Sequence, residues 1–261
     1  GWALKAGQLF WTNDHGASWQ TLALPEPGPI LSADFVSDSQ GWIAIRGAGA
    51  AALQIYRTSD RGKTWLASAP GLAPEDPPVG SVSLSFPDAQ TGWIAVTFQT
   101  SRAFRLGALF MTPDGGVTWT RLALPAGGEI RFVSSTVGWL QDDGDIYQTV
   151  DGGRSWRKLE GGDPALAAYR LAWLGLLSPA ADSSTLEFDQ VLTLLPQATR
   201  QASFTDPDSG WALVQEGACN GVKPKPGESL PAGANPLTCS LNAKLLRTLD
   251  GGRSWSEMTI H

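Results

Sequence analysis

Five aspartates recur in one short motif, and repeated carboxylates are the first groups in this sequence that could do chemistry. The motif reads Thr, any residue, Asp, any residue, Gly, any residue, Ser or Thr, and then Trp. Its aspartates are Asp14, Asp60, Asp114, Asp151 and Asp250, and its tryptophans are Trp19, Trp65, Trp119, Trp156 and Trp255. A carboxylate can serve as a general acid or base, but it can equally accept hydrogen bonds from the backbone of a turn. Five copies at one position favour turn formation, so we predict structural aspartates and no catalytic residue.

The sequence has few residues in patterns that could bind a metal or a cofactor. Residues 142–145 read Asp-Asp-Gly-Asp, and several oxygen ligands in one loop could hold calcium. We favour the alternative, a tight hairpin turn with Asp-Gly at its tip. The two histidines, His15 and His261, share no motif with each other or with the cysteines, and no phosphate-binding glycine loop is present. We therefore predict no metal and no cofactor.

The two cysteines, Cys219 and Cys239, enclose a stretch rich in Pro and Gly. Strand-like residues flank them, so a disulfide would close the base of a long hairpin loop over 219–239. On loop-entropy reasoning it would stabilise the fold by roughly 3 kcal/mol. Two free thiols are the alternative. A disulfide would indicate an oxidising compartment.

A second motif alternates with the first and completes a repeating unit of structure. It consists of Phe, five residues and Gly-Trp, at Phe35/Trp42, Phe86/Trp93, Phe132/Trp139 and Phe204/Trp211. A further Gly-Trp opens the sequence. Each unit predicts a four-stranded antiparallel sheet: the Phe strand, the Gly-Trp strand, a strand leading into the Asp turn, and a strand begun by the motif's Trp. Such sheets repeated radially form a β-propeller. The predicted fold is all-β, with five recognisable blades and six or more in the closed ring.

One stretch departs from the repeat inside what we predict to be a single propeller domain over 1–261. Residues 159–201 could be a degenerate blade, because 186–195 resemble a strand. They could instead contain an inserted helix over 165–177, with Asp163 as its N-cap and Pro164 as its first residue. We favour the degenerate blade.

The aspartate motifs resemble the Asp-box, or bacterial neuraminidase repeat. The pairing of Gly-Trp with Thr-x-Asp-Gly-Gly-x-Ser-Trp, at Trp139 with 149–156 and at Trp211 with 248–255, most resembles the photosystem II stability and assembly-factor-like propellers. The resemblance covers nearly the whole chain, apart from about 159–201 and the cysteine loop. It implies a non-enzymatic scaffold outside the cytoplasm that holds a membrane-protein partner during assembly.

Asp boxes also occur in sialidases, so a sialidase-like glycoside hydrolase is the alternative function. Such an enzyme needs an arginine cluster for the substrate carboxylate and a Tyr nucleophile paired with Glu. Only Arg131 lies clearly on a predicted innermost strand. Tyr56 and Tyr147 each precede an Asp box, on a third strand away from the centre. We therefore predict that the protein is not an enzyme.

Charge and hydropathy narrow the range of partners. The net charge of −6 disfavours nucleic acid, and no apolar run reaches the roughly 20 residues of a transmembrane helix. We expect a protein partner, a membrane protein or complex, and an extracytoplasmic location in the periplasm, a lumen or at the cell surface. A removed N-terminal segment could have carried a membrane anchor.

Candidate binding residues are Lys223, Lys225, Arg131 and Trp173. A structural subunit of a surface assembly, whose open blade edge accepts a neighbour's strand, is a further alternative.

Overall fold

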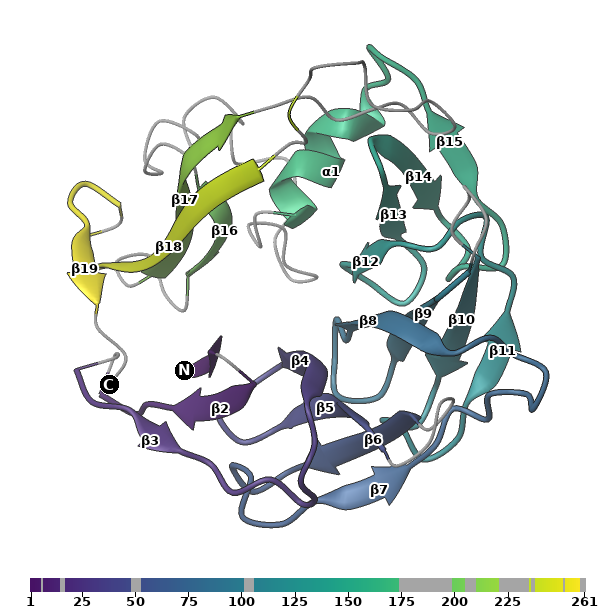
Figure 1. Ribbon diagram of the computed structural model, residues 1–261, viewed down its shortest axis with the longest axis horizontal. Helices are drawn as coiled ribbons and strands as arrows, with labels where there is room; N and C mark the ends of the chain where they lie inside the picture. Colours follow the sequence, from purple (N-terminus) through teal and green to yellow (C-terminus); the bar gives the residue numbers. More distant parts are fainter. Residues whose placement is uncertain are drawn as a thin grey trace. The chain divides into compact units, whose positions relative to one another are not determined.

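The computed structural model describes residues 1–5, 7–14, 17–47, 53–100, 106–173, 199–204, 210–220, 235, 238–250 and 252–258. Its strands form five antiparallel sheets, one of three strands and four of four (Figure 1). Each sheet is one blade, which confirms the predicted all-β propeller class and its five recognisable blades. A sixth blade stays a prediction. The chain divides into two compact units, Gly1–Tyr169 and Arg170–His261.

Each blade is a meander in which consecutive strands pair. Blade A contains β1 (Trp2–Lys5), β2 (Gln8–Trp11) and β3 (Gln20–Thr21). Blade B contains β4 (Ile30–Phe35), β5 (Gly41–Arg46), β6 (Leu53–Thr58) and β7 (Leu66–Ser68). Blade C contains β8 (Val79–Ser85), β9 (Gly92–Phe98), β10 (Gly107–Thr112) and β11 (Thr120–Leu122). Blade D contains β12 (Glu129–Phe132), β13 (Gly138–Asp142), β14 (Asp145–Thr149) and β15 (Arg157–Leu159). Blade E contains β16 (Thr199–Phe204), β17 (Gly210–Asn220), β18 (Thr238–Thr248) and β19 (Ser256–Met258).

The second strands of blades B and C are the most deeply buried elements of the first unit. Residues 42–45 of β5 and 93–96 of β9 have no exposed surface. Both faces of these strands are covered, so they lack the apolar–polar alternation of a half-exposed strand and read as continuous apolar runs. The core of the first unit therefore lies between its blades.

An aromatic stack joins each blade of the first unit to the next. The ring of Trp42 lies 3.7 Å from that of Phe86, and Trp93 lies at the same distance from Phe132, with the planes nearly parallel. The glycine before each Trp has a physical reason. A Cβ on Gly92 would fall 2.1 Å from Phe86 Cε1, so only glycine lets the ring lie flat on the backbone. Trp2 and Phe35 make the equivalent stack between blades A and B.

A helix, α1 (Ala165–Trp173), follows blade D. Asp163 Oδ1 accepts a hydrogen bond from the Ala165 amide at 2.9 Å, which is the N-cap of the inserted-helix alternative. The other alternative, a degenerate blade, depends on residues that lie outside the described part of the chain. One local expectation is wrong: the strand after each Asp box begins one residue beyond the Trp, as β7 does after Trp65.

Candidate functional site

The five Asp boxes fold into one hydrogen-bonded turn, which Asp60 illustrates. Asp60 Oδ1 accepts hydrogen bonds from Thr58 Oγ1 and the Thr64 amide, both at 2.9 Å. Its Oδ2 accepts one from Thr64 Oγ1 at 2.6 Å, and the Gly62 amide donates to Thr58 Oγ1 at 2.8 Å. The carboxylate contacts recur at the other four boxes, around Asp14, Asp114, Asp151 and Asp250.

These contacts fix the protonation state of the box carboxylates. Hydrogen bonds from the Ser or Thr hydroxyl, followed by those from the backbone, stabilise the ionised form. They lower the pKa of Asp60, Asp114, Asp151 and Asp250 to about 2, and that of Asp14 well below its usual range. At neutral pH these groups hold no proton to donate, and their oxygens are already engaged. The box aspartates are therefore unsuited to general acid catalysis.

The box tryptophans pack near the same turns. Trp119 lies edge-on to Phe86, with ring centroids 6.3 Å apart, and Trp156 lies edge-on to Phe132 at 6.1 Å. Trp119 Nε1 donates to Ser68 Oγ of blade B at 3.2 Å. The side chains of all five box tryptophans are partly buried.

The Phe/Gly-Trp motif contains a further recurring residue, a Ser or Asp in the turn between the Phe and the Gly-Trp, which the sequence analysis did not identify. The residue two positions after the Phe is Ser37 in blade B, Asp88 in blade C and Ser134 in blade D. Its side-chain oxygen accepts backbone hydrogen bonds within the turn, as in the bond from the Thr91 amide to Asp88 Oδ1 at 2.7 Å. The recurrence of Ser or Asp at this position was the available signal.

Polar side chains on the first strands of blades B and C cap the first strand of the next blade. The Leu84 amide donates to Ser32 Oγ at 3.1 Å, and the Phe86 amide donates to Asp34 Oδ2 at 2.6 Å. Blade C repeats the arrangement toward blade D, through Ser83 with Ile130 at 3.1 Å and Ser85 with Phe132 at 2.7 Å. Side chains of one blade therefore satisfy backbone amides of the next.

Arg131 ends this row of caps. It occupies in β12 the position that Asp34 and Ser85 occupy in β4 and β8, directly before the Phe. A guanidinium donates hydrogen bonds and cannot accept them, so Arg131 cannot cap an amide as its counterparts do. Burial raises the pKa of Asp34 above its ordinary value, and the positive charge of Arg131 opposes that shift. We call Ser32, Asp34, Ser83, Ser85, Glu129 and Arg131 the first-strand row, and it is the candidate functional site.

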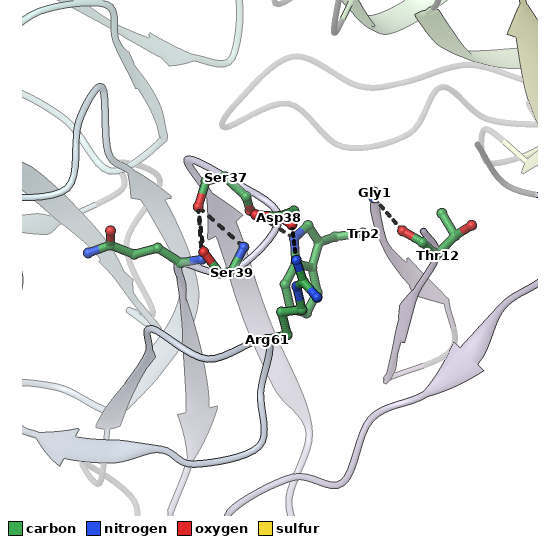
Figure 2. Close-up of polar contacts among 8 residues, drawn as sticks. Gly1, Trp2, Thr12, Ser37, Asp38, Ser39 and Arg61 are labelled. Carbon is green, nitrogen blue, oxygen red and sulfur yellow. Dashed lines mark hydrogen bonds and ion pairs between the residues drawn. The ribbon is translucent and has the colours of Figure 1, made fainter. Parts of the chain in front are cut away.

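Figure 2 shows the junction of blades A and B, where Arg61 departs from the repeat. Arg61 has φ 66°, a left-handed conformation that glycines take at the equivalent positions of blades C and D. Its guanidinium donates to Asp38 at 2.6 Å and lies 5.5 Å from the ring centre of Trp11. Trp2 Nε1 donates to the Ser37 carbonyl at 3.1 Å. The left-handed backbone conformation of Arg61 costs energy in any residue that has a Cβ atom, and the contacts of its side chain accompany that cost.

The remaining predicted residues are not brought together into one site. Lys223 and Lys225 lie outside the described residues. Trp173 ends α1 and is half-buried. The backbones of Cys219 and Cys239 pair directly across β17 and β18, so the disulfide stays a prediction that this register allows. Of the tyrosines, Tyr56 lies on β6 and Tyr147 on β14, both third strands.

The acidic residues at 142–145 form a turn and not a metal site within the described residues. Asp142 and Asp145 pair across a turn in which Asp143 and Gly144 have φ of 43° and 99°, the pattern of a tight two-residue hairpin. No group of three His, Cys, Asp or Glu side chains within the described ranges could hold a metal ion. No described helix has the length and apolar character needed to cross a bilayer.

Comparisons with known proteins give distant relatives of two kinds. The chain is 28% identical over 144 residues to the photosystem II assembly lipoprotein Ycf48 of Synechococcus sp. (strain CC9902), covering 53% of this chain and 39% of that protein. It is 27% identical over 171 residues to a xyloglucanase of Paenibacillus sp, covering 58% of this chain and 16% of the enzyme. The chain thus spans well under half the length of either relative. No protein-family model matches.

Solved structures of the same two kinds are also similar. A structure of YCF48 bound to D1 peptide aligns with a TM-score of 0.45 at 19% identity, over 92% of this chain and 85% of that one. The GH74 xyloglucanase of Xanthomonas campestris aligns with a TM-score of 0.40 at 13% identity, over 98% of this chain and 44% of that one.

Proposed function

We propose that this protein is a non-enzymatic scaffold that binds a protein partner, and that the partner is a membrane protein or complex. One observation carries the proposal. All five box carboxylates, the most prominent candidate catalytic groups of the sequence, are engaged in turn hydrogen bonds and ionised at neutral pH. The repeat therefore builds the scaffold, and binding falls to residues outside it.

The likeness to the photosystem II assembly lipoprotein Ycf48 supports the same function. By analogy, this chain would hold its partner during assembly, outside the cytoplasm. The proposal includes an extracytoplasmic location in the periplasm, a lumen or at the cell surface, and a closed ring of six or more blades.

Within the scaffold, we assign partner contact to the first-strand row and centre it on Arg131. This residue breaks the pattern of caps that blades B and C keep, and its guanidinium is only partly buried. A charged side chain that does not form the inter-blade hydrogen bond of its counterparts, and is partly exposed, is suited to binding a partner on a rigid framework.

The test is an affinity capture with cross-linking from detergent-solubilised envelope membranes of the organism that encodes this chain. The wild-type chain should recover one membrane protein or complex, and Arg131→Ala should recover about tenfold less of it. Arg253→Ala is the matched control, since Arg253 is exposed in the box turn of blade E. Equal capture by both variants would move the contact elsewhere, and no specific capture by the wild type would refute the scaffold function.

Glycoside hydrolysis is the second candidate, favoured by the likeness to the xyloglucanase of Paenibacillus sp. Hydrolysis would need two carboxyl groups facing one glycosidic bond. In the first-strand row, Asp34, whose raised pKa suits an acid, and Glu129 are the carboxyl groups available. Reducing-sugar release from xyloglucan and from a sialoside, compared with Asp34→Asn, distinguishes the two functions. Turnover by the wild type that Asp34→Asn abolishes would establish the enzyme.

A further inference from the structure

Four aspartates are followed directly by glycine, and this dipeptide can rearrange without an enzyme. The glycine nitrogen attacks the side-chain carboxyl carbon of the aspartate, so a carbon–nitrogen bond forms and one water leaves as a succinimide ring closes. Water then cleaves the ring at either carbonyl carbon, which gives back aspartate or gives isoaspartate, whose main chain runs through the former side chain. The four dipeptides are Asp114–Gly115, Asp143–Gly144, Asp151–Gly152 and Asp250–Gly251. The glycine of the last one lies outside the described residues, as does that of Asn220–Gly221, which can close the same ring with loss of ammonia.

In the Asp boxes of blades C and D, hydrogen bonds hold both reacting groups of the dipeptide. The Gly152 amide of blade D donates to the Thr136 carbonyl at 2.8 Å. The carboxylate of Asp151 accepts a hydrogen bond from the Ser155 amide at 2.9 Å and another from the hydroxyl of the same residue. Blade C repeats these contacts, with 2.6 Å for the bond from its glycine amide. Ring closure in either box would have to break these bonds.

The Asp143–Gly144 dipeptide lies in a different setting, at the tip of the hairpin between β13 and β14. Both of its residues are exposed. A Cβ on Gly144 would meet nothing within 4 Å, whereas a Cβ on Gly152 would fall 2.9 Å from the Ser135 carbonyl oxygen. The Gly144 amide lies beyond the last pair of the hairpin and has no hydrogen-bond partner among the described residues. The attacking nitrogen of this dipeptide is therefore accessible, and its backbone has room to change conformation.

The protonation state of the box carboxylates adds to their protection. A carboxyl group loses an oxygen as water more easily when it is protonated than when it is ionised. Hydrogen bonds from the Ser or Thr hydroxyl, followed by those from the backbone, lower the pKa of Asp114 and Asp151 to about 2. Both groups therefore stay ionised at pH 5, where a protonated aspartate would react.

We propose that Asp143 is a site of spontaneous isomerisation to isoaspartate in the folded protein, and that the fold directs the reaction there by holding the dipeptides of the boxes. The product has one more carbon in its main chain, so the two-residue turn loses the strand register that it sets. Two contacts lie beside the turn: Lys158 Nζ is 2.8 Å from Asp145 Oδ2, and the Tyr169 hydroxyl donates to Gln141 Oε1 at 2.6 Å. Isomerisation therefore loosens this end of blade D. The inference does not depend on the scaffold function.

The test incubates the whole folded chain at pH 5 and about 37 °C, digests it with trypsin, and applies mass spectrometry with electron-transfer fragmentation, which distinguishes isoaspartate from aspartate. Trypsin releases residues 132–154 as one peptide, so Asp143 and the protected Asp151 are compared within the same molecule. Asp143 should isomerise at least about tenfold faster, because ring closure at the box must first break the hydrogen bond of its amide. In urea that unfolds the chain, the two rates should agree within about threefold.

Two variants check the assignment, and both suit the left-handed conformation of this turn. Asp143→Asn closes the same ring with loss of ammonia. At pH 7.5 it should form isoaspartate at this position faster than the wild type does, because a neutral amide group is a better target for the nitrogen than a carboxylate. Asp143→Gly is the matched control, since it keeps a two-residue turn without a carboxyl group and should abolish isoaspartate at this position.

The outcomes that would overturn the proposal are separate. Isomerisation in the folded chain that is as fast at Asp151 as at Asp143 would refute selection by the fold. Isoaspartate at Asp143 that forms in urea and not in the folded chain would mean that the turn itself blocks ring closure, and an Asp143→Asn chain that stays intact would mean the same. Amide hydrogen exchange at 141–146 that is equal in the isomerised and unmodified chains would refute the loosening of blade D.

Discussion

Trp93 and Trp139 hold the same position in blades C and D and differ in one hydrogen bond. Their side chains are 0% and 1% exposed. Trp93 Nε1 donates to the Gly152 carbonyl at 3.0 Å, as Trp42 Nε1 does to Gly115 at 2.9 Å. Trp139 Nε1 is buried and finds no acceptor in the described part of the chain. The two sites therefore allow one substitution to be compared with and without a partner.

Trp→Phe at each site removes similar apolar area, so the difference between the two losses isolates the hydrogen bond. Trp93→Phe leaves the buried Gly152 carbonyl without its donor, which costs about 1–3 kcal/mol. Trp139→Phe instead removes a buried donor that has no acceptor among the described residues, which offsets part of the lost packing. We expect Trp93→Phe to be less stable than Trp139→Phe by about 1–3 kcal/mol, or roughly 2–4 °C in Tm per kcal/mol.

The measurement is urea unfolding followed by far-ultraviolet circular dichroism, because fluorescence would change with the tryptophan itself. Equal m-values are required for the comparison, since a changed slope would mean a changed unfolded state. Equal losses at the two sites, or a larger loss at Trp139, would refute the hydrogen-bond argument.

Three further predictions follow from the blade contacts. The pKa of Asp60 is lowered to about 2, so its stabilisation is present above the ordinary value of 3.8 and is lost as pH falls toward 2; Asp60→Asn should flatten the acid limb of a Tm–pH profile. A Cβ on Gly92 would overlap the Phe86 ring, so Gly92→Ala should lower stability by about 1–3 kcal/mol in urea titrations, whereas Gly161→Ala, with open space around it, should be near neutral. Burial raises the pKa of Asp34, so ionising its carboxyl group costs stability that grows as pH rises above the ordinary value of 3.8. Asp34→Ser should therefore raise Tm at pH 8 more than at pH 4. The reverse order would contradict burial of its charge.

The repeat was predictable because its residues act locally. The Asp-box spacing brings a carboxylate back onto its own turn, and the Gly-Trp strand predicted for blade B is found as β5. The place of Asp163 at the start of a helix was also readable as a capping signal. By contrast, the choice between helix and blade for 159–201 could not be made from propensity, because apolar residues of that kind suit both a helix and a buried strand.

The candidate site was less accessible to sequence reasoning. Arg131 was identified by its place before Phe132, but its relation to Asp34 was not, because 97 residues separate the two along the chain. The caps from Ser32 and Asp34 to the next blade likewise join residues 52 positions apart. Such contacts depend on how blades stack, which no local pattern specifies.

The sequence by itself determined the blade. Periodic Asp, Gly and Trp fix turns through short-range hydrogen bonds and through backbone conformations that only glycine takes easily. Only the tertiary structure decided which polar groups form hydrogen bonds within and between the blades. It showed that the box carboxylates are engaged in their own turns, that Arg131 stands where blades B and C have a capping side chain, and that β17 and β18 pair over their full length. The physical reason is range: a turn closes within a few residues, whereas burial and pairing are settled only when distant strands meet.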